Sequence, residues 1–322
     1  MPIRALGQVF DPMVRLLAVA ILLASLLPAT GEGRDIAQSV SNAAIFLLFL
    51  LNGLRLPRAE VLRGMGHWRL LLPLAFWCFG AMALAGWIAW QALSGLLAPM
   101  VALGFLYLGV LPSTVQSATA YSSLAGGNVA SSVVAAATIN IAGVFVTAPI
   151  FAALAGGEEV SLGWEGLQRI ALILLLPFAL GQLLQGRLGQ FVAGHRRMLG
   201  WADRSAIAIA VYVAFSGAVE QGIWERIDAF QWAVLLAGVL AFLAFGFGGA
   251  WLLGSVVRLD RGDRTAMLFA GAQKSIAMGA PLAMILFSPE AAGMILLPVL
   301  IYHLLQLVVS APIASRLAAR PR

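Results

Sequence analysis

The only lysine of the chain, Lys274, stands in an apolar stretch with a polar residue on each side, Gln273 and Ser275. Arg264 precedes Lys274 by ten residues. A helix that entered a membrane at that arginine would rise about 1.5 Å per residue and place Lys274 near the bilayer midplane. A charged side chain at that depth costs roughly 3 kcal/mol or more, and its stem is too short to snorkel well to an interface. A role for Lys274 in handling an ion or a substrate is therefore expected.

A second polar stretch follows Pro112, in the sequence LPSTVQSATAYSS. A single Ser or Thr in a membrane helix often bonds its own backbone or lets two helices approach closely, but this density predicts a polar lining. A helical segment that begins after the proline would direct free amides and its positive dipole end at an anion. The candidate binding residues of this stretch and the next apolar span are Ser113, Thr114, Gln116, Ser117, Thr119, Asn128 and Ser132.

No Asp or Glu stands near the middle of the apolar stretches that carry these residues, so Lys274 has no obvious carboxylate partner. Three arrangements remain open. Backbone carbonyls and hydroxyls could hold the ammonium, desolvation could keep the amine neutral, or an anionic substrate could complete the pair. The first arrangement gives a built-in cation, the second a proton carrier and the third a binding site.

His303 lies in the last apolar stretch, three residues before Gln306 and on the same helical face. A histidine there serves either a hydrogen bond between helices or a proton route. The three histidines and the single cysteine, Cys78, lie on distant segments, so neither a metal site nor a cofactor is predicted. His67 and His195 fall in predicted loops, and no role is expected for them.

The composition places the chain in a lipid bilayer. Hydrophobic residues make up 61% of the 322 residues and charged residues only 11%, whereas a soluble domain carries about 25% charged residues. The formal net charge of +6 is explained by arginines in cytoplasmic loops. No basic cluster interleaved with aromatic residues stands outside the apolar spans, so nucleic acid is not an expected partner.

We predict an all-α polytopic membrane protein with ten transmembrane helices in a single domain, residues 1–322. Most of the apolar spans approach the ~20 residues that a membrane-crossing helix needs. The spans are Pro12–Pro28, Ile36–Leu54, Leu70–Trp90, Leu97–Tyr121, Val129–Leu154, Ile170–Leu188, Ser205–Val219, Trp232–Val257, Thr265–Phe287 and Ala291–Ala314.

The distribution of arginine predicts the orientation. With ten spans and both termini in the cytoplasm, only Arg34, Arg169 and Arg226 fall on outer segments, and the other arginines fall on inner ones. That asymmetry is the positive-inside pattern of a multi-pass protein. We expect cytoplasmic N- and C-termini in a bacterial inner membrane.

Ten spans divide into two groups of five, and an odd number per half inserts the second half upside down. The fourth span is interrupted at Pro112, and the ninth, its counterpart, carries Gly271, Gly279 and Pro281. Interrupted helices at corresponding positions of two halves point to a transporter binding site. We therefore predict helix breaks at these four residues.

The segment PMVALGFLYLGVLPSTVQSATAYSSLAGGNVASSVV resembles the fourth and fifth helices of the bile acid:sodium symporter family. The pairs Lys274–Ser275 and Tyr302–His303 match its divergent branch, which resembles solute carrier family 10 member 7. The resemblance implies ten helices in two inverted repeats, about 12–155 and about 170–316, with broken helices 4 and 9 crossing. It also implies a core of helices 3–5 and 8–10 and a panel of helices 1, 2, 6 and 7.

The chain departs from that family where sodium is held. Sodium-coupled members carry Glu and Gln in the ninth helix, and the resemblance aligns that Glu with Phe269 and the Gln with Gln273. Lys274 takes the position of an Asn, and Ala118 replaces an Asn of the fourth helix. The hypothesis is that Lys274 replaces the sodium ion permanently.

The expected function is secondary-active transport of a small organic anion by alternating access, without enzymatic activity. The expected partners are the anionic substrate, a possible coupling ion (H⁺ or Na⁺) and the bilayer. The alternatives are a cation/proton exchanger of the same architecture and a non-transporting membrane regulator of ion homeostasis. An enzyme that uses Ser275 with Lys274 as a base is disfavoured, because adjacent residues of a helix point about 100° apart.

Overall fold

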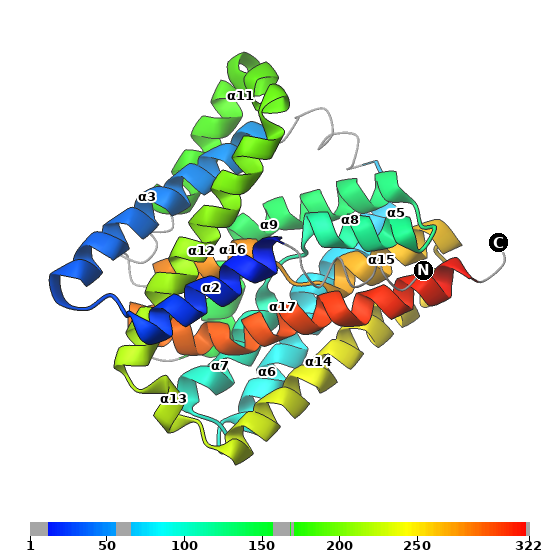
Figure 1. Ribbon diagram of the computed structural model, residues 1–322. Helices are drawn as coiled ribbons and strands as arrows, with labels where there is room; N and C mark the ends of the chain where they lie inside the picture. The colour runs from blue at the N-terminus through cyan, green and yellow to red at the C-terminus, as the bar shows by residue number, and fades with distance from the viewer. Residues whose placement is uncertain (1–11, 56–65, 157–167, 169–170, 320–322) are drawn as a thin grey trace.

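The computed structural model of the chain describes residues 12–55, 66–156, 168 and 171–319, and the described part contains helices but no strand (Figure 1). The helices are α2 (Pro12–Leu26), α3 (Gly31–Arg55), α5 (Trp68–Phe76), η1 (Trp77–Ala81), α6 (Met82–Leu93), α7 (Pro99–Val110), α8 (Val115–Leu124), α9 (Val129–Ala155), η3 (Ala171–Leu175), α11 (Leu176–Gly194), α12 (Arg196–Glu220), α13 (Ile223–Arg226), α14 (Ala229–Val256), α15 (Arg261–Ala272), α16 (Ile276–Leu286) and α17 (Pro289–Ala318).

Seven helical stretches of the described residues are long and apolar enough to cross a membrane, and α2, α7 and α16 are shorter apolar helices. Many large apolar side chains on their outer faces are exposed, among them Leu72, Phe76 and Leu183. Such faces suit contact with lipid, where helices satisfy their own backbone hydrogen bonds. The prediction of an all-α polytopic membrane protein is confirmed.

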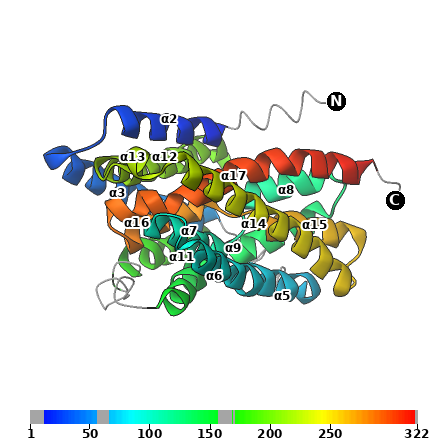
Figure 2. The ribbon, with the colours of Figure 1, turned by 90° about the horizontal axis from the view of Figure 1, so that it is seen from below.

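The helices form two groups in the views of Figures 1 and 2. Helices α3, α11 and α12 extend along one side of the molecule, whereas α5, α8 and α15 lie on the other. Figure 2 shows α2 at one edge, with α5 and α6 at the opposite edge. The long helix α17 runs between the groups and contacts both α12 and α7.

The helix α12 begins earlier than its apolar pattern predicts. The predicted span starts at Ser205, but the helix starts at Arg196. The additional turns carry Asp203, which pairs with Arg55 at the end of α3. An apolar window misses this extension because its turns contain charged residues, of which Asp203 binds a neighbouring helix.

Both predicted helix interruptions exist, but the second lies elsewhere than expected. Helix α7 ends at Val110 and α8 begins at Val115, so Pro112 lies in the first break as predicted. Helix α15 ends at Ala272 and α16 begins at Ile276, so the second break comprises the three residues 273–275.

The prediction of helix breaks at Gly271, Gly279 and Pro281 is wrong, since Gly271 lies within α15 and the other two within α16. The two glycines serve close packing instead. A Cβ at Gly271 would stand 2.8 Å from Trp77, and a Cβ at Gly279 would stand 2.8 Å from Leu111.

The two breaks lie against each other. Ser113 of the first break and Lys274 of the second form an isolated antiparallel bridge. The backbone N–H of Ser275 donates to the carbonyl of Pro112 at 2.9 Å. Each broken helix thereby supplies backbone partners that the other lost where its helical hydrogen bonds stop.

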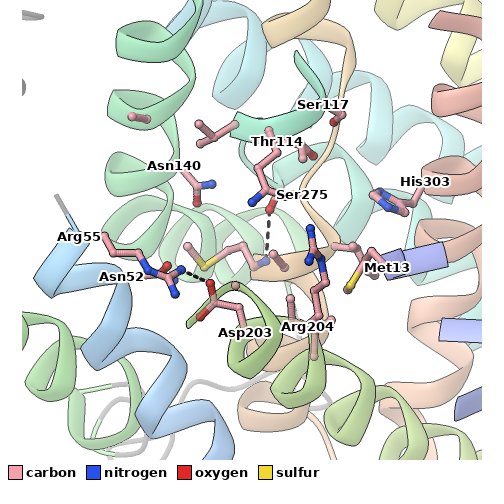
Figure 3. A pocket seen from close by; sticks show the side chains of 18 of the residues that line it. Met13, Asn52, Arg55, Thr114, Ser117, Asn140, Asp203, Arg204, Ser275 and His303 are labelled. Atoms are coloured by element: carbon pink, nitrogen blue, oxygen red, sulfur yellow. Dashed lines mark hydrogen bonds and ion pairs between the residues drawn. The ribbon is translucent and has the colours of Figure 1, made fainter. Parts of the chain in front are cut away.

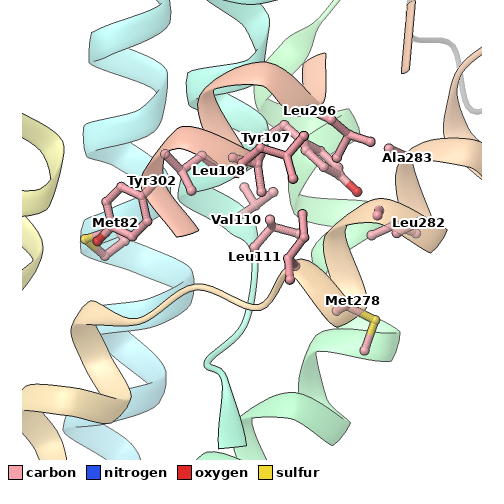
Figure 4. Close-up of a cluster of buried hydrophobic side chains, with 14 of the residues drawn as sticks. Met82, Tyr107, Leu108, Val110, Leu111, Met278, Leu282, Ala283, Leu296 and Tyr302 are labelled. Atoms are coloured by element: carbon pink, nitrogen blue, oxygen red, sulfur yellow. The ribbon is translucent and has the colours of Figure 1, made fainter. Parts of the chain in front are cut away.

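The apolar core surrounds α7, α16 and α17 (Figure 4). Helix α7 is apolar all round and is buried from Val101 to Val110, as expected for a helix enclosed by others. Its Tyr107 hydroxyl donates to the Gly279 carbonyl at 2.6 Å, and Tyr302 of α17 donates to the Ala272 carbonyl at 2.6 Å. These phenols link the core to the second broken helix.

Candidate functional site

The amine of Lys274 is enclosed by backbone carbonyl oxygens. Nζ donates to the carbonyls of Leu111 at 2.8 Å, Gly109 at 2.9 Å and Cys78 at 3.3 Å. The residue is only 1% exposed, and no ion pair involves it within the described residues. Of the three arrangements that the sequence leaves open, the structure contains the one in which carbonyls hold the amine.

The end of α7 supplies hydrogen-bond acceptors for the amine. The last carbonyls of a helix have no partner within the helix, and they carry the negative end of its dipole. Gly109 and Leu111 stand at that end, because α7 stops at Val110. An ammonium group has three donors, and here three carbonyls accept from it. The neighbouring Val110 carbonyl accepts from the Thr147 hydroxyl at 3.2 Å.

The side chain of Gln306 from α17 holds the backbone of Lys274. Its Oε1 accepts from the Lys274 N–H at 2.8 Å, and its Nε2 donates to the Lys274 carbonyl at 3.1 Å. The Thr114 hydroxyl donates to the same carbonyl at 2.8 Å. The predicted site residue His303 contacts Gln306 through Nδ1 at 2.9 Å.

Further polar side chains at the crossing bond Gln273 or the backbone of the first break. Gln273 is fully buried, and its Nε2 donates to the Ser310 hydroxyl of α17 at 2.9 Å. The Ser117 hydroxyl of α8 donates to Oε1 of Gln273. Asn140 of α9 donates to the Ser113 carbonyl at 3.2 Å. Asn140 of α9 and Gln306 of α17 thus bond the non-helical backbone of the two breaks, whereas Ser117 and Ser310 bond the Gln273 side chain.

A cavity of about 380 Å³ lies beside this crossing (Figure 3). One wall belongs to α2, α3, α11 and α12, and the other to α8, α9, α16 and α17. The lining residues are Met13, Asn52, Arg55, Thr114, Val115, Gln116, Ser117, Ala137, Asn140, Ile141, Val144, Phe178, Gly200, Asp203, Arg204, Ile207, Ser275, Ile276, Ala277, Met278, His303 and Leu307.

Two helix N-termini open onto the cavity. The first residues of α8 and of α16 belong to its lining, and each terminus carries roughly half a positive charge. The Ser275 side chain caps its own helix by accepting from the Met278 N–H at 3.2 Å. Thr114 makes no such cap, because its hydroxyl bonds Lys274 instead. Free amides and dipole ends of this kind favour an anion.

Charged side chains stand on the opposite wall. Arg55 pairs with Asp203, and both line the cavity. Arg204, the next residue of α12, makes no ion pair within the described residues, and its guanidinium lies 5.5 Å from the centre of the Trp201 ring. The described residues of this wall therefore carry two positive charges and one negative charge.

The structure divides the predicted site residues between cavity, crossing and other places. Thr114, Gln116, Ser117, Ser275 and His303 line the cavity. Ser113, Gln273 and Lys274 belong to the crossing behind it, and all three are at most 1% exposed. The arrangement in which Lys274 directly contacts a substrate in this cavity therefore finds no support.

Three other predicted site residues lie apart from the cavity lining. Asn128 caps the start of α9 and donates to Asp263 at 3.0 Å. Ser132 donates to the Ser122 hydroxyl at 3.0 Å. Thr119 does not line the cavity either. Asn128 thus joins the start of α9 to α15, and Ser132 joins α9 to α8.

Sequence reasoning missed the charged wall. Arg55 and Arg204 were assigned to inner loops, and Asp203 was given no role. The sequence signal that could have indicated this wall is Asp203, an acid among basic residues at the edge of the predicted span Ser205–Val219. His67, expected to be idle, contacts Asp263 through Nε2 at 3.1 Å and Ser131 through Nδ1 at 3.3 Å.

No group of three His, Cys, Asp or Glu side chains that could hold a metal occurs within the described residues. Cys78 is buried, its backbone carbonyl accepts from the Lys274 amine, and its thiol donates to the Ala270 carbonyl of α15 at 3.9 Å. The absence of a metal and of a cofactor stays a prediction.

Comparison with known proteins identifies the chain as similar to membrane transporters. The chain matches the family model of the SBF-like CPA transporter family over residues 11–319. It is 37% identical over 315 residues to an uncharacterized protein of Pseudomonas aeruginosa, covering 96% of this chain and 93% of that one. It is 36% identical over 322 residues to the candidate symporter YfeH of Escherichia coli K12, covering 97% and 94%. It is 24% identical over 305 residues to mouse sodium/bile acid cotransporter 7, covering 91% and 88%.

The apolar helices and these matches define a multi-pass membrane transporter. The chain belongs to the bile acid:sodium symporter family, in its SBF-like branch. The resemblance seen in the sequence is confirmed at the level of the family.

Proposed function

We propose that the protein is a secondary-active transporter that moves a small organic anion by alternating access, with the Lys274 amine in place of a sodium ion. One observation carries the proposal. Two half-helix N-termini face one cavity together with Arg204, which makes no ion pair within the described residues, and the cavity lies between two groups of helices. Half-helix N-termini directed at an anionic substrate group are a recurring feature of transporter sites.

The proposed architecture has ten membrane helices in two inverted repeats, about 12–155 and about 170–316. The panel comprises α2, α3, α11 and α12, and the core comprises α5 to α9 and α14 to α17. The helix order supports this division, since an interrupted helix, α7–α8 or α15–α16, comes fourth in each repeat. We place both termini in the cytoplasm of a bacterial inner membrane.

The surroundings of Lys274 support its role as a built-in cation. Backbone carbonyl oxygens are ligands that a sodium ion would also take, and three of them bind the amine instead. Phe269, aligned with the Glu of sodium-coupled members, is fully buried and stacks on Tyr121 with ring centres 5.8 Å apart. An aromatic cluster thus stands where a charged ligand is expected, which supports transport without sodium coupling.

Ion pairs at the far end of α3 support alternating access. Arg34, near the start of that helix, binds Glu220 of α12 at 3.0 Å and Glu290 of α17 at 2.5 Å. Arg55, at the other end of the same helix, lines the cavity. Arg55 stands 21 positions after Arg34, a rise of about 30 Å, which is close to the thickness of a bilayer core. In the proposed orientation, Arg34 joins panel to core on the outer side, and the cavity lies toward the cytoplasm.

One observation favours the cation/proton exchanger as a second candidate. Asp203 is a carboxylate in the cavity lining, and exchangers of this architecture use an acid to carry the cation. The Arg55 guanidinium already neutralises it, which favours the anion transporter.

The test is transport by purified protein in proteoliposomes. We expect counterflow of a labelled organic anion in sodium-free buffer, at a rate that added sodium does not raise. A saturable requirement for sodium would overturn the built-in cation. Sodium or proton exchange without any anion flux would favour the exchanger instead.

A further inference from the structure

The cavity has two separate positive features, one on each wall. On the panel wall Arg55 and Arg204 stand beside a single carboxylate, Asp203, so within the described residues of this wall one positive charge is not compensated. Figure 3 shows the Arg204 side chain pointing from α12 into the cavity, toward the side on which Ser275 and His303 lie. Its guanidinium makes no ion pair within the described residues, and it can form the paired, planar contacts that arginine makes with carboxylates.

On the core wall the positive features are the starts of α8 and α16. Both helices are long enough to carry a dipole, with 10 and 11 residues respectively. Together they supply about one positive unit. Within the lining residues the only carboxylate is Asp203, which stands on the other wall. The ligand-binding side of the core thus contributes no opposing charge.

We infer that the substrate is an anion with two acidic groups, of which one binds the starts of α8 and α16 and the other binds Arg204. This inference rests on the proposed function. The inference rests on charge balance. A ligand with one acid group would compensate the positive charge of only one of the two walls. The side chains of Ile141, Val144, Phe178 and Ile207 complete the lining, so the part that joins the two acids is a hydrocarbon chain or ring.

Arg204 is then the residue that determines specificity. A ligand with a single acid would reach the helix starts and leave the guanidinium unpaired, whereas a diacid would connect the panel to the core. Asp203 has a positioning role, since it binds Arg55 and leaves one arginine for the substrate.

Matched ligand pairs test the inference by calorimetric titration of purified protein in sodium-free buffer. The probes are α,ω-dicarboxylates of four to ten carbons, each beside its monomethyl ester of nearly equal length. We expect at least one diacid to bind at least about tenfold more tightly than its ester. The Arg204→Gln variant should lose that preference and keep its affinity for the ester, which also shows that the variant is folded.

Two further variants sharpen the test. Arg204→Lys keeps the charge and should retain most of the preference. Arg196→Gln changes an exposed arginine of the same helix that does not line the cavity, and it should bind like the unaltered protein.

Three results would overturn the inference. The unaltered protein could bind no diacid more tightly than its ester, Arg204→Gln could weaken diacid and ester equally, or it could keep the preference. Transport of monoanions with no preference for diacids would leave the proposed function standing while the inference fails. An absence of anion binding and of anion flux would overturn both.

Discussion

The amine of Lys274 donates to the carbonyl of Leu111 at 2.8 Å and so joins one broken helix to the other. Leu111 directly follows the last residue of α7, whereas Lys274 occupies the middle of the second break. The amine of one break therefore supplies a hydrogen-bond donor to the carbonyl end of the helix that precedes the other break. The contact makes the lysine part of the scaffold that positions the cavity.

Replacing Gln306 should loosen the crossing. Gln306→Leu removes both side-chain hydrogen bonds to the Lys274 backbone and leaves buried polar groups unpaired, each at about 1–3 kcal/mol. We expect the melting temperature of the purified protein to fall by several degrees in differential scanning fluorimetry. Gln116→Leu makes the same change at an exposed position of the cavity and should have little effect. Equal melting temperatures for the two variants would contradict this role of Gln306.

The contact between α3 and α11 depends on two facing glycines. A Cβ at Gly53 would collide with the carbonyl oxygen of Phe178 and stand 3.1 Å from the Cα of Gly181. Gly53→Ala should therefore separate the helices and destabilise the protein by about 1–3 kcal/mol, because a closely packed contact is overfilled. Thermal unfolding measures the change.

Gly189→Ala is the matched control on α11, since no heavy atom lies within 4 Å of the added Cβ. Alanine favours a helix over glycine, so this variant should be unchanged or slightly more stable. Destabilisation of both variants to the same degree would show that helix content, not contact with α3, decides the outcome.

Breaking the ion pair between Arg34 and Glu290 should favour opening of the outer side. Arg34→Gln removes this arginine's contacts with both Glu220 and Glu290 while the cavity is left intact. We expect a cysteine at Ala137, in the cavity lining, to react several-fold faster with a membrane-impermeant maleimide added from outside. Cys78 is replaced by alanine in this background.

Arg226→Gln is the control for that experiment, because Arg226 also falls on a predicted outer segment but makes no ion pair within the described residues. Its labelling rate should match that of the background. If Arg34→Gln leaves the rate unchanged as well, these ion pairs do not hold the outer side closed.

The sequence predicted the first broken helix and the burial of Lys274 for physical reasons that held. Pro112 lacks an N–H and excludes a continuous helix, and a lone lysine amid apolar residues must find partners. The second break was placed wrongly, since its residues 273–275 include neither glycine nor proline. Side chains of Thr114 and Gln306 stabilise it from other helices, which no local pattern reveals.

The partners of Lys274 were equally hidden. Every residue has a carbonyl, and the sequence does not show that those at the end of α7 and that of Cys78 in η1 meet at the amine. The charged wall was hidden by distance along the chain, since Arg55 and Asp203 come from α3 and α12. In the sequence, Arg55 and Asp203 each lie in a basic segment that is predicted to face the cytoplasm, so neither residue indicates a binding site.

The most direct test of the built-in cation is a sodium titration of the melting temperature, on the unaltered protein and on Lys274→Ala. Removing the amine leaves the carbonyls of Cys78, Gly109 and Leu111 without their cation and should destabilise the protein by about 3 kcal/mol or more. We predict that sodium, but not choline at equal ionic strength, saturably restores stability to the variant and leaves the unaltered protein unchanged. Saturable stabilisation of the unaltered protein by sodium would contradict the account, because a sodium site would then exist beside the lysine.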